Sequence, residues 1–337
     1  MAQGIHAFKG FLGAGVQVGT DLRAATVART HFARFHDIEI TESQGEEIDP
    51  TSGRRDPESA SLGDYGIDIK GTLEGTTEGL IPLLAQSLMG GTIATTTVGT
   101  TGKKHTLTGF ADQLTGHSRL TLEQRFGTDA EAELLNAIIK SLEFNINQAG
   151  YARWSIEGVG SSPARLATPT VPTLPDPLTL LAQRFTTFSL GGSTAMVVRN
   201  LSWKLATQLD EDDYDISSRQ RRDASYDESM ATFDAELTFQ DMTELRRFWG
   251  SASATAPEDT EAYHAVDIQT QRADLIAGGT AKHGVQLTLP KCFLTKVSTP
   301  LQGRKVIRQK VQGRAIYDPS STASAVLAVT NTVASYP

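Results

Sequence analysis

Polar and apolar residues alternate along ten segments of the chain. Successive side chains of a strand point to opposite faces of the sheet, so this period of two buries one face and leaves the other wet. Antiparallel sheets commonly have this character, and the sequence therefore predicts a mainly β protein. The predicted strands span residues 36–43, 65–75, 118–126, 140–148, 152–160, 196–208, 231–239, 265–276, 284–295 and 305–317.

Helical spacing of apolar residues occurs in three segments. Segment 76–90 begins with threonines and contains Pro82, so we expect its first turns to be irregular. Segment 240–251 reaches Gly250, a residue type that commonly ends helices. Segment 130–140 is a third and shorter helix prediction.

The two halves of the chain present similar segments in the same order, which indicates an internal repeat. Asp68 matches Asp234 at an offset of 166, and Thr77-Glu78 matches Thr243-Glu244 at the same offset. In each half a strand is followed by a helix. We therefore predict an internal duplication that gives two related β-sandwich domains, each with a flanking helix.

A proline-rich segment divides the two halves, because residues 161–179 hold five of the thirteen prolines. Such segments favour extended, poorly packed chain. The glycine-rich stretch at 10–19 fits neither dinucleotide-binding nor P-loop spacing, and we interpret it as a flexible arm that enters the first strand. The predicted organisation is an N-terminal arm (1–14), a first β domain (15–160), a linker (161–182) and a second β domain (183–333).

Two polar connections, one in each half, concentrate charges of both signs. Each runs from an acidic cluster through hydroxyl residues to an Arg-Arg-Asp sequence, and Arg54 matches Arg221 at an offset of 167. Both are longer than common hairpin loops, so we expect them to be functional or mobile. The charged residues are Glu46, Glu47, Asp49, Arg54, Arg55 and Asp56 in the first half, and Asp210, Glu211, Asp212, Asp213, Asp215, Arg219, Arg221, Arg222 and Asp223 in the second.

These acidic clusters do not have the spacing of a metal site. A calcium loop needs oxygen ligands at alternating positions and a glycine at its sharp turn. Asp210, Asp212 and Tyr214 alternate, but no glycine follows them. Zinc-type histidine and cysteine spacings and a nucleophile elbow are also missing from the sequence. We therefore expect no catalysis, no metal and no cofactor, and interpret the charges as a solvated surface or a contact surface.

Composition narrows the class of protein further. The net charge of −8 and the pI of about 5.4 argue against a protein that holds nucleic-acid phosphates through a basic surface. The single cysteine, Cys292, lies in an apolar run and is expected to fill the core, so a reducing compartment is predicted. The N-terminus does not resemble a signal peptide, and apolar runs are too short to span a membrane, so we expect synthesis in a cytoplasm and no membrane partner.

Several stretches resemble the major tail tube proteins of long-tailed bacteriophages. The likeness is carried by diffuse patterns rather than by one fixed signature, and it extends from about residue 13 to residue 333. The two charged connections do not follow the pattern of this family. The stretches that carry the resemblance are GAGVQVGTDLRAATVARTHFARF (13–35), KKHTLTGFADQLTGHSRLTLEQRFG (103–127), LLNAIIKSLEFNINQAGYARWSIEGVG (134–160), MVVRNLSWKLATQLDED (196–212) and AVLAVTNTV (325–333).

The resemblance implies a structural subunit of the virion tail, made in the host cytoplasm. Copies would form rings whose inner sheets close into a β-barrel, and a duplicated chain would need three copies for a pseudo-hexameric ring. Stacked rings would form a hollow conduit through which genomic DNA passes without specific binding. The implied partners are other copies of the chain and the tape measure, terminator and distal tail proteins, and the two-domain size suggests a non-contractile tail.

Three alternatives stay open from the sequence. Another phage structural component, such as a tail terminator or a distal tail protein, is a second prediction. A calcium-dependent carbohydrate-binding β-sandwich is a third, based only on the acidic run. For a tail tube, the mixed charges of the two connections predict contacts that fix the register between stacked rings, with plain solvated hairpins as the alternative.

Overall fold

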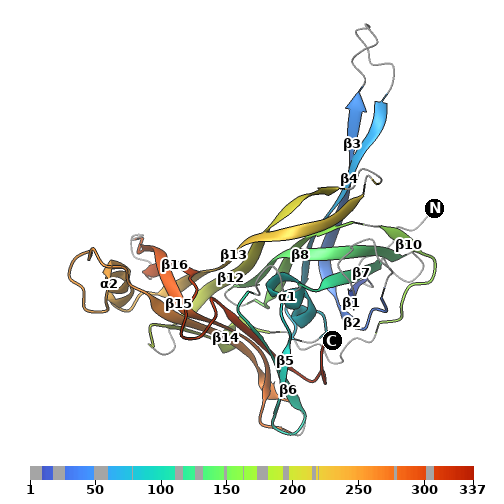
Figure 1. Ribbon diagram of the computed structural model, residues 1–337. Helices are drawn as coiled ribbons and strands as arrows, with labels where there is room; N and C mark the ends of the chain where they lie inside the picture. Colours follow the sequence, from blue (N-terminus) through green and yellow to red (C-terminus); the bar gives the residue numbers. More distant parts are fainter. Residues whose placement is uncertain are drawn as a thin grey trace, which may run out of the picture.

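The computed structural model contains seventeen β-strands and two α-helices within the residues that it describes. The strands form one large curved array, from which the β3/β4 hairpin projects at one end (Figure 1). The mainly β fold predicted from the sequence is thus confirmed. The described residues are 10–17, 27–48, 60–77, 79–110, 117–125, 132–147, 150–161, 163–172, 181–192, 197–214, 218, 220–276, 279–300 and 307–337.

Each of the ten predicted strands overlaps a strand of the structure. Seven further strands are shorter or lack clear alternation. In chain order the strands are β1 (Phe11–Gln17), β2 (His31–Ala33), β3 (Phe35–Ile48), β4 (Ala60–Glu74), β5 (Ala94–Val98), β6 (Gly102–Thr108), β7 (Arg119–Arg125), β8 (Ala132–Ile146), β9 (Arg153–Gly160), β10 (Ala164–Leu166), β11 (Thr186–Leu190), β12 (Val198–Tyr214), β13 (Arg221–Thr238), β14 (His264–Leu275), β15 (Lys282–Ser298), β16 (Arg308–Ala315) and β17 (Val326–Asn331).

Both stronger helix predictions are confirmed, although each helix is shorter than predicted. Helix α1 (Ile81–Met89) begins with its proline in the first turn, where the missing N–H is not needed, and all nine of its residues are buried. Helix α2 (Thr243–Trp249) ends at Gly250, whose N–H donates to the carbonyl of Arg247. Gly250 has a φ of 144°, which favours glycine.

The prediction of a helix at 130–140 is wrong, because residues 132–140 belong to strand β8. Leu135, Ala137, Ile138 and Ile139 are all buried, so both faces of the strand are covered at this point. A continuous apolar run in a central strand does not alternate, and periodicity alone cannot distinguish it from a buried helix.

Eight strands form a continuous antiparallel sheet in the order β3, β4, β9, β8, β12, β13, β16, β15. Strand β8 joins the halves, because its last part lies between β9 and β12 while its first part lies between β7 and β10. Strand β15 has the same position in the second half, with β14 and β17 beside its first part and β16 beside its last part.

The two halves have the same pairing order. In the first half β3, β4, β9, β8, β7 and β1 are successive neighbours, and in the second half β12, β13, β16, β15, β14 and β11 are. Irregularities in the ladders also match. In β3 the register shifts between Phe35 and Asp37, and in β12 it shifts between Val198 and Asn200, 163 residues further on.

A second bulge gives a second fixed point for matching the halves. The register shifts between Ile139 and Ser141 in β8, and between Leu294 and Lys296 in β15, an offset of 155. Strand β4 matches β13 at an offset of 164, since Leu73 pairs with Phe35 and Leu237 pairs with Val198. The sequence match at 166 is therefore two residues off in this strand, a slip that period-two alternation cannot detect.

The core lies on one face of this sheet and continues across the junction between the halves. Trp203 of β12 packs against Phe144 of β8 and Trp154 of β9, with ring centroids 5.5 and 5.4 Å away. All three rings are buried, and Trp154 donates its indole N–H to the carbonyl of Thr76. Aromatic contacts of this size contribute to one shared core.

Two segments that were expected to pack poorly contribute described residues to this fold. Phe11, Leu12 and Ala14 lie in β1 and are buried, so the interpretation of residues 11–14 as a flexible arm is wrong. In the proline-rich segment, Thr170 donates both its N–H and its hydroxyl to the buried carboxylate of Glu123. Proline restricts the backbone but leaves the other residues of a segment able to bond.

Candidate functional site: the polar sheet face and the two charged hairpins

One face of the eight-stranded sheet is polar. Along β12, Leu201, Trp203 and Leu205 are buried, whereas Ser202 and Lys204 between them are partly exposed. The same alternation recurs along the neighbouring strands, so that hydrophilic side chains form a continuous layer opposite the core.

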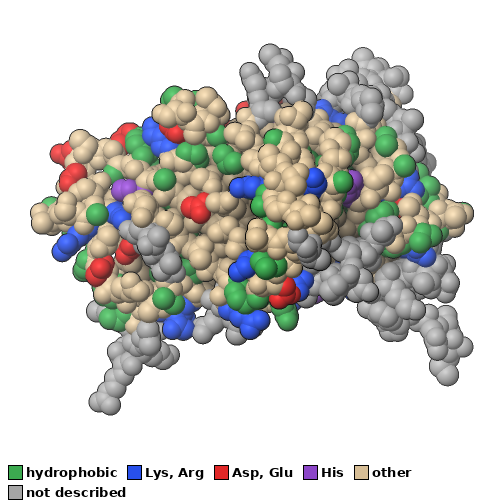
Figure 2. All heavy atoms as spheres, turned by 90° about the horizontal axis from the view of Figure 1, so that it is seen from below, with side chains coloured by type: hydrophobic (Ala, Val, Ile, Leu, Met, Phe, Trp, Pro, Cys, Tyr) green, Lys and Arg blue, Asp and Glu red, His purple; other side chains and the backbone are tan. Residues whose placement is uncertain are grey.

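Charges on the polar face are largely matched by opposite charges. Lys204 lies 4.0 Å from Glu157, and Arg308 lies 2.9 Å from Glu236. Burial alone raises the pKa of Glu236, but hydrogen bonds from Arg308 and Asn200 outweigh this and lower the pKa. On the face seen from below Figure 1, Lys and Arg are likewise interspersed with Asp and Glu (Figure 2).

The first charged stretch lies on the projecting β3/β4 hairpin (Figure 1). Glu46 is exposed, and its backbone pairs with Leu62 of β4. Glu47 also belongs to β3, where it pairs with Ser61. The remaining candidates of this stretch, Asp49, Arg54, Arg55 and Asp56, lie outside the described residues.

The second charged stretch is mostly strand rather than the long connection predicted from the sequence. Strand β12 continues to Tyr214 and β13 starts at Arg221, so the acidic run belongs to an antiparallel ribbon. Main-chain hydrogen bonds hold the two strands of such a ribbon together. Both faces of the ribbon can therefore be exposed to solvent, and its sequence needs no apolar pattern. Asp212, Asp213, Arg222 and Asp223 lie in these strands, their side chains outside the described part, and Asp215 and Arg219 lie outside it altogether.

Arg221 faces the inside of the molecule rather than solvent. Only 6% of the residue is exposed, and its Nε donates to the carbonyl of Glu211 at 2.8 Å. Its Nη2 lies 3.4 Å from the carboxylate of Glu211, which Lys140 also approaches at 3.2 Å. Arg221 thus stabilises the ribbon within one chain. Asp210 is exposed and Glu211 partly so, and a role for these acids between rings stays a prediction.

The β12/β13 hairpin contacts the first half of the chain. Gln220 forms a bridge with Tyr65 of β4, and the guanidinium of Arg221 lies close to Gly66. A Cβ at Gly66 would be 3.6 Å from Nη2 of Arg221 and 3.2 Å from the hydroxyl oxygen of Ser43. The two charged hairpins therefore meet near the base of the projecting one.

Tyr226 of β13 anchors this contact, and the sequence patterns did not single it out. Its ring stacks on His117 with centroids 3.4 Å apart, and its hydroxyl donates to the carbonyl of Ser87 in α1 at 3.0 Å. It also packs against Ile138 and Val159 of the first half. Burial lowers the pKa of His117. An aromatic residue inside a charged run was the one available signal.

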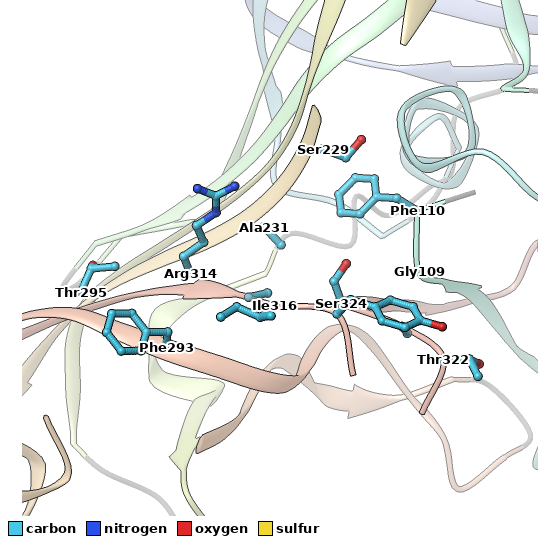
Figure 3. Close-up of a pocket in the computed structure, with 13 residues that line it drawn as sticks. Gly109, Phe110, Ser229, Ala231, Phe293, Thr295, Arg314, Ile316, Thr322 and Ser324 are labelled. Carbon is cyan, nitrogen blue, oxygen red and sulfur yellow. The ribbon is translucent and has the colours of Figure 1, made fainter. Parts of the chain in front are cut away.

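A pocket of about 610 Å³ is lined by residues of both halves, with Phe293 and Arg314 on one side of it and Phe110 and Ser229 on the other (Figure 3). Its walls come from the loop after β6, from β13, β15 and β16, and from the segment before β17. The full lining is Gly109, Phe110, Ser229, Ala231, Phe293, Thr295, Arg314, Ala315, Ile316, Tyr317, Thr322, Ala323 and Ser324.

Within the described part of the chain, His, Cys, Asp and Glu side chains form no group of three or more that could hold a metal ion. Cys292 is buried as expected, and burial raises the pKa of its thiol to about 12. A thiol with so high a pKa is protonated at neutral pH and is a poor nucleophile.

A separate finding is that the two described helices lack the length and apolarity needed to cross a membrane.

The family model described as "Phage tail tube protein" matches residues 8–293, which is most of the chain. The search among curated proteins found no significant match.

Proposed function

The chain belongs to the phage tail tube protein family, and we propose that it is the structural subunit of a tail tube built from stacked rings. Each ring would contain three copies, with the six halves arranged in pseudo-sixfold symmetry. The tube would be a non-contractile conduit for genomic DNA that also contacts tape measure, terminator and distal tail proteins. This role needs self-assembly and no catalysis.

The single observation that best supports the proposal is the joint between β8 and β12. Within one chain, the last part of β8 pairs with β12, the first strand of the next hairpin. In the second half, the last part of β15 corresponds to β8, and its outer edge pairs with no strand among the described residues. The outer edge of β3, which corresponds to β12, is likewise without a strand partner in the described part of the chain.

A second copy can satisfy both edges by repeating the internal joint. If β15 of one copy pairs with β3 of the next, the eight-stranded sheets continue head to tail, and a rotation that closes makes a ring. Closure removes exposed sheet edges, which otherwise favour uncontrolled pairing. The matching strand order of the halves supports an internal duplication, with the two predicted β domains as its products.

The polar face of the sheet is the surface we assign to the inside of the conduit. The opposite face is occupied by the core and by α1, so it is not available to line a channel. Charges on the polar face are engaged with one another, as in the Lys204–Glu157 pair. With a net charge of −8 for the chain, such a wall gives DNA phosphates no basic surface to bind.

The charged end of the projecting β3/β4 hairpin, which begins at Glu46, is the part we assign to contacts between stacked rings. It extends beyond the body of the subunit, and Glu46 near its described end is exposed (Figure 1). Charged side chains at such a contact fix partner and register more than they add affinity. The same role is proposed for the other charged residues of the two stretches, except for Arg221.

Electron microscopy of the purified protein tests the function. We expect hollow filaments of uniform width. Discrete rings that never elongate would favour a tail terminator or a distal tail protein, and particles that stay monomeric at high concentration would contradict the tube.

Paired cysteines test the joint between copies. Lys204 pairs with Glu143 inside the chain, and the matched positions are Thr41 in β3 and Ser298 in β15, at offsets of 163 and 155. The variant Thr41→Cys/Ser298→Cys should form disulfides between copies in assembled tubes. The matched control, Thr41→Cys/Val297→Cys, should not, because a shift of one residue puts the second side chain on the opposite face.

A further inference from the structure

One buried cross-strand pair in the first half packs against the second half. Ile138 of β8 lies directly opposite Val159 of β9, and each is 0% exposed. Tyr226 of the β12/β13 hairpin covers both, together with Leu209, which pairs with Tyr226 across the ribbon. This contact is the part of the internal joint in which a side chain of one half fills a hollow of the other.

The corresponding pair in the second half is uncovered. Phe293 of β15 lies opposite Arg314 of β16, and the β8 and β15 bulges that follow assign these two residues to the positions of Ile138 and Val159. Phe293 is 42% exposed, and the side chain of Arg314 is 45% exposed. The pocket of about 610 Å³ lies at this place (Figure 3).

The residue that corresponds to Tyr226 is Leu62. Glu46 pairs with Leu62 after the second bulge of the β3/β4 hairpin, as Leu209 pairs with Tyr226 in β12/β13. Leu62 is 64% exposed and lies on the hairpin that projects from the body. Single exposed apolar side chains are common on protein surfaces, so the informative feature of Leu62 is that it occupies the position of the buried Tyr226.

We propose that Leu62 of one copy inserts into the pocket of the neighbouring copy in the ring, against Phe293 and the aliphatic part of Arg314. This inference rests on the proposed ring and names the residues that lock it. Leucine is smaller than the tyrosine of the internal contact, whereas phenylalanine and arginine are larger than its isoleucine and valine. The side chains on the two sides of the proposed contact are therefore complementary in size. Arg314 is held by an ion pair with Glu228, which leaves its methylene groups to form a wall of the pocket.

The pocket cannot be filled by Leu62 of the same chain. Strands β3 and β15 are the two ends of the eight-stranded sheet, so the projecting hairpin and the pocket lie at opposite ends of one subunit. The β12/β13 hairpin already occupies the corresponding hollow between the halves. The partner required is therefore a second copy of this chain, in a head-to-tail contact.

Substitutions of Leu62 test the proposal. Leu62→Asp should leave the melting temperature of the subunit unchanged, because the side chain is exposed, and should weaken tube assembly roughly ten- to a hundredfold, as expected for losing one buried leucine. Leu62→Tyr, which copies the internal contact, should still assemble. The matched control is Leu275→Asp, which changes another exposed leucine, 55% exposed, outside the pocket.

A photo-crosslinking residue at position 62 identifies what the hairpin touches. In assembled tubes we expect crosslinks to peptides that contain Phe293 or Arg314 of another copy. Crosslinks to a different surface, or normal assembly of the Leu62→Asp variant, would overturn the contact while leaving the tube intact. If the wild-type chain forms no tubes, the proposed function itself fails, so the two failures are distinguishable.

Discussion

The pair Ile138–Val159 and the pair Phe293–Arg314 occupy the same position of the sheet in the two halves, yet one is buried and the other is open to solvent. The difference comes from what lies above them. In the first half Tyr226 supplies a permanent cover from the same chain, whereas the second half presents a pocket. One joint is thus made on folding, and in the proposed ring its counterpart is made on assembly.

The two hairpins differ in the same way. The β12/β13 hairpin is docked through Tyr226 and the Lys140–Glu211 ion pair, while the β3/β4 hairpin projects with Leu62 exposed (Figure 1). A subunit that satisfies one of its two equivalent contacts internally gains stability from it and keeps the other available. The predictions below separate the stabilising contact from the available one, in order of decreasing expected effect.

Trp203 should have the largest effect, because it joins the cores of both halves. Trp203→Ala removes a buried ring that packs on Phe144 and Trp154, and we expect about 3–5 kcal/mol of lost stability. Urea unfolding followed by circular dichroism measures it. Val171→Ala, at an exposed position, serves as the control and should change stability little. A loss below 1 kcal/mol for Trp203→Ala would mean that the halves do not share a core.

Tyr226 and Leu62 occupy matched positions and should respond differently to the same truncation. Tyr226→Ala loses a buried ring and the hydrogen bond to Ser87, and should destabilise the isolated subunit by about 2–4 kcal/mol. Leu62→Ala should stay within about 0.5 kcal/mol, since Leu62 is exposed before assembly. Equal losses for the two variants would remove the distinction between a folding contact and an assembly contact.

Arg221 and Glu46 make a comparable pair among the charged residues. Arg221→Glu places a carboxylate beside Glu211 in a buried position and should cost the subunit about 1–3 kcal/mol. Glu46→Arg reverses an exposed charge and should leave the subunit stable while altering how rings stack. Thermal melting gives the first effect and tube length the second. An Arg221→Glu subunit as stable as the wild type would show that its buried contacts contribute nothing.

Lowering the pH should destabilise the subunit by less than the substitutions described above. Burial lowers the pKa of His117, and also of His31, His105 and His283. The unfolded chain then binds protons more readily, so stability is full above the ordinary histidine pKa of about 6.5 and is lost as pH falls below it. Melting temperatures between pH 8 and pH 5 measure this. The variant His117→Phe should retain stacking on Tyr226 and lose part of the decrease; an unchanged pH profile would exclude His117 as a contributor.

The strands were predictable because alternation follows directly from the geometry of a half-buried sheet. The central part of β8 was not, since covering both faces removes the alternation, and it was predicted as a helix. For the charged stretch of the second half, polar composition was a poor guide to secondary structure. Its residues are polar, but main-chain pairing makes most of it strand, and Arg221 is buried with its guanidinium bonded to Glu211.

The sequence by itself determined the β class, the repeated order of segments, the two helices and the resemblance to phage tail tube proteins, because each depends on local patterns. The tertiary structure alone decided which hairpin is docked and which is free. Tyr226 and Leu62 are each one apolar residue in a charged run, and their difference lies in the surface that meets them. That surface is assembled from strands and a helix far apart in the chain, so no local pattern specifies it.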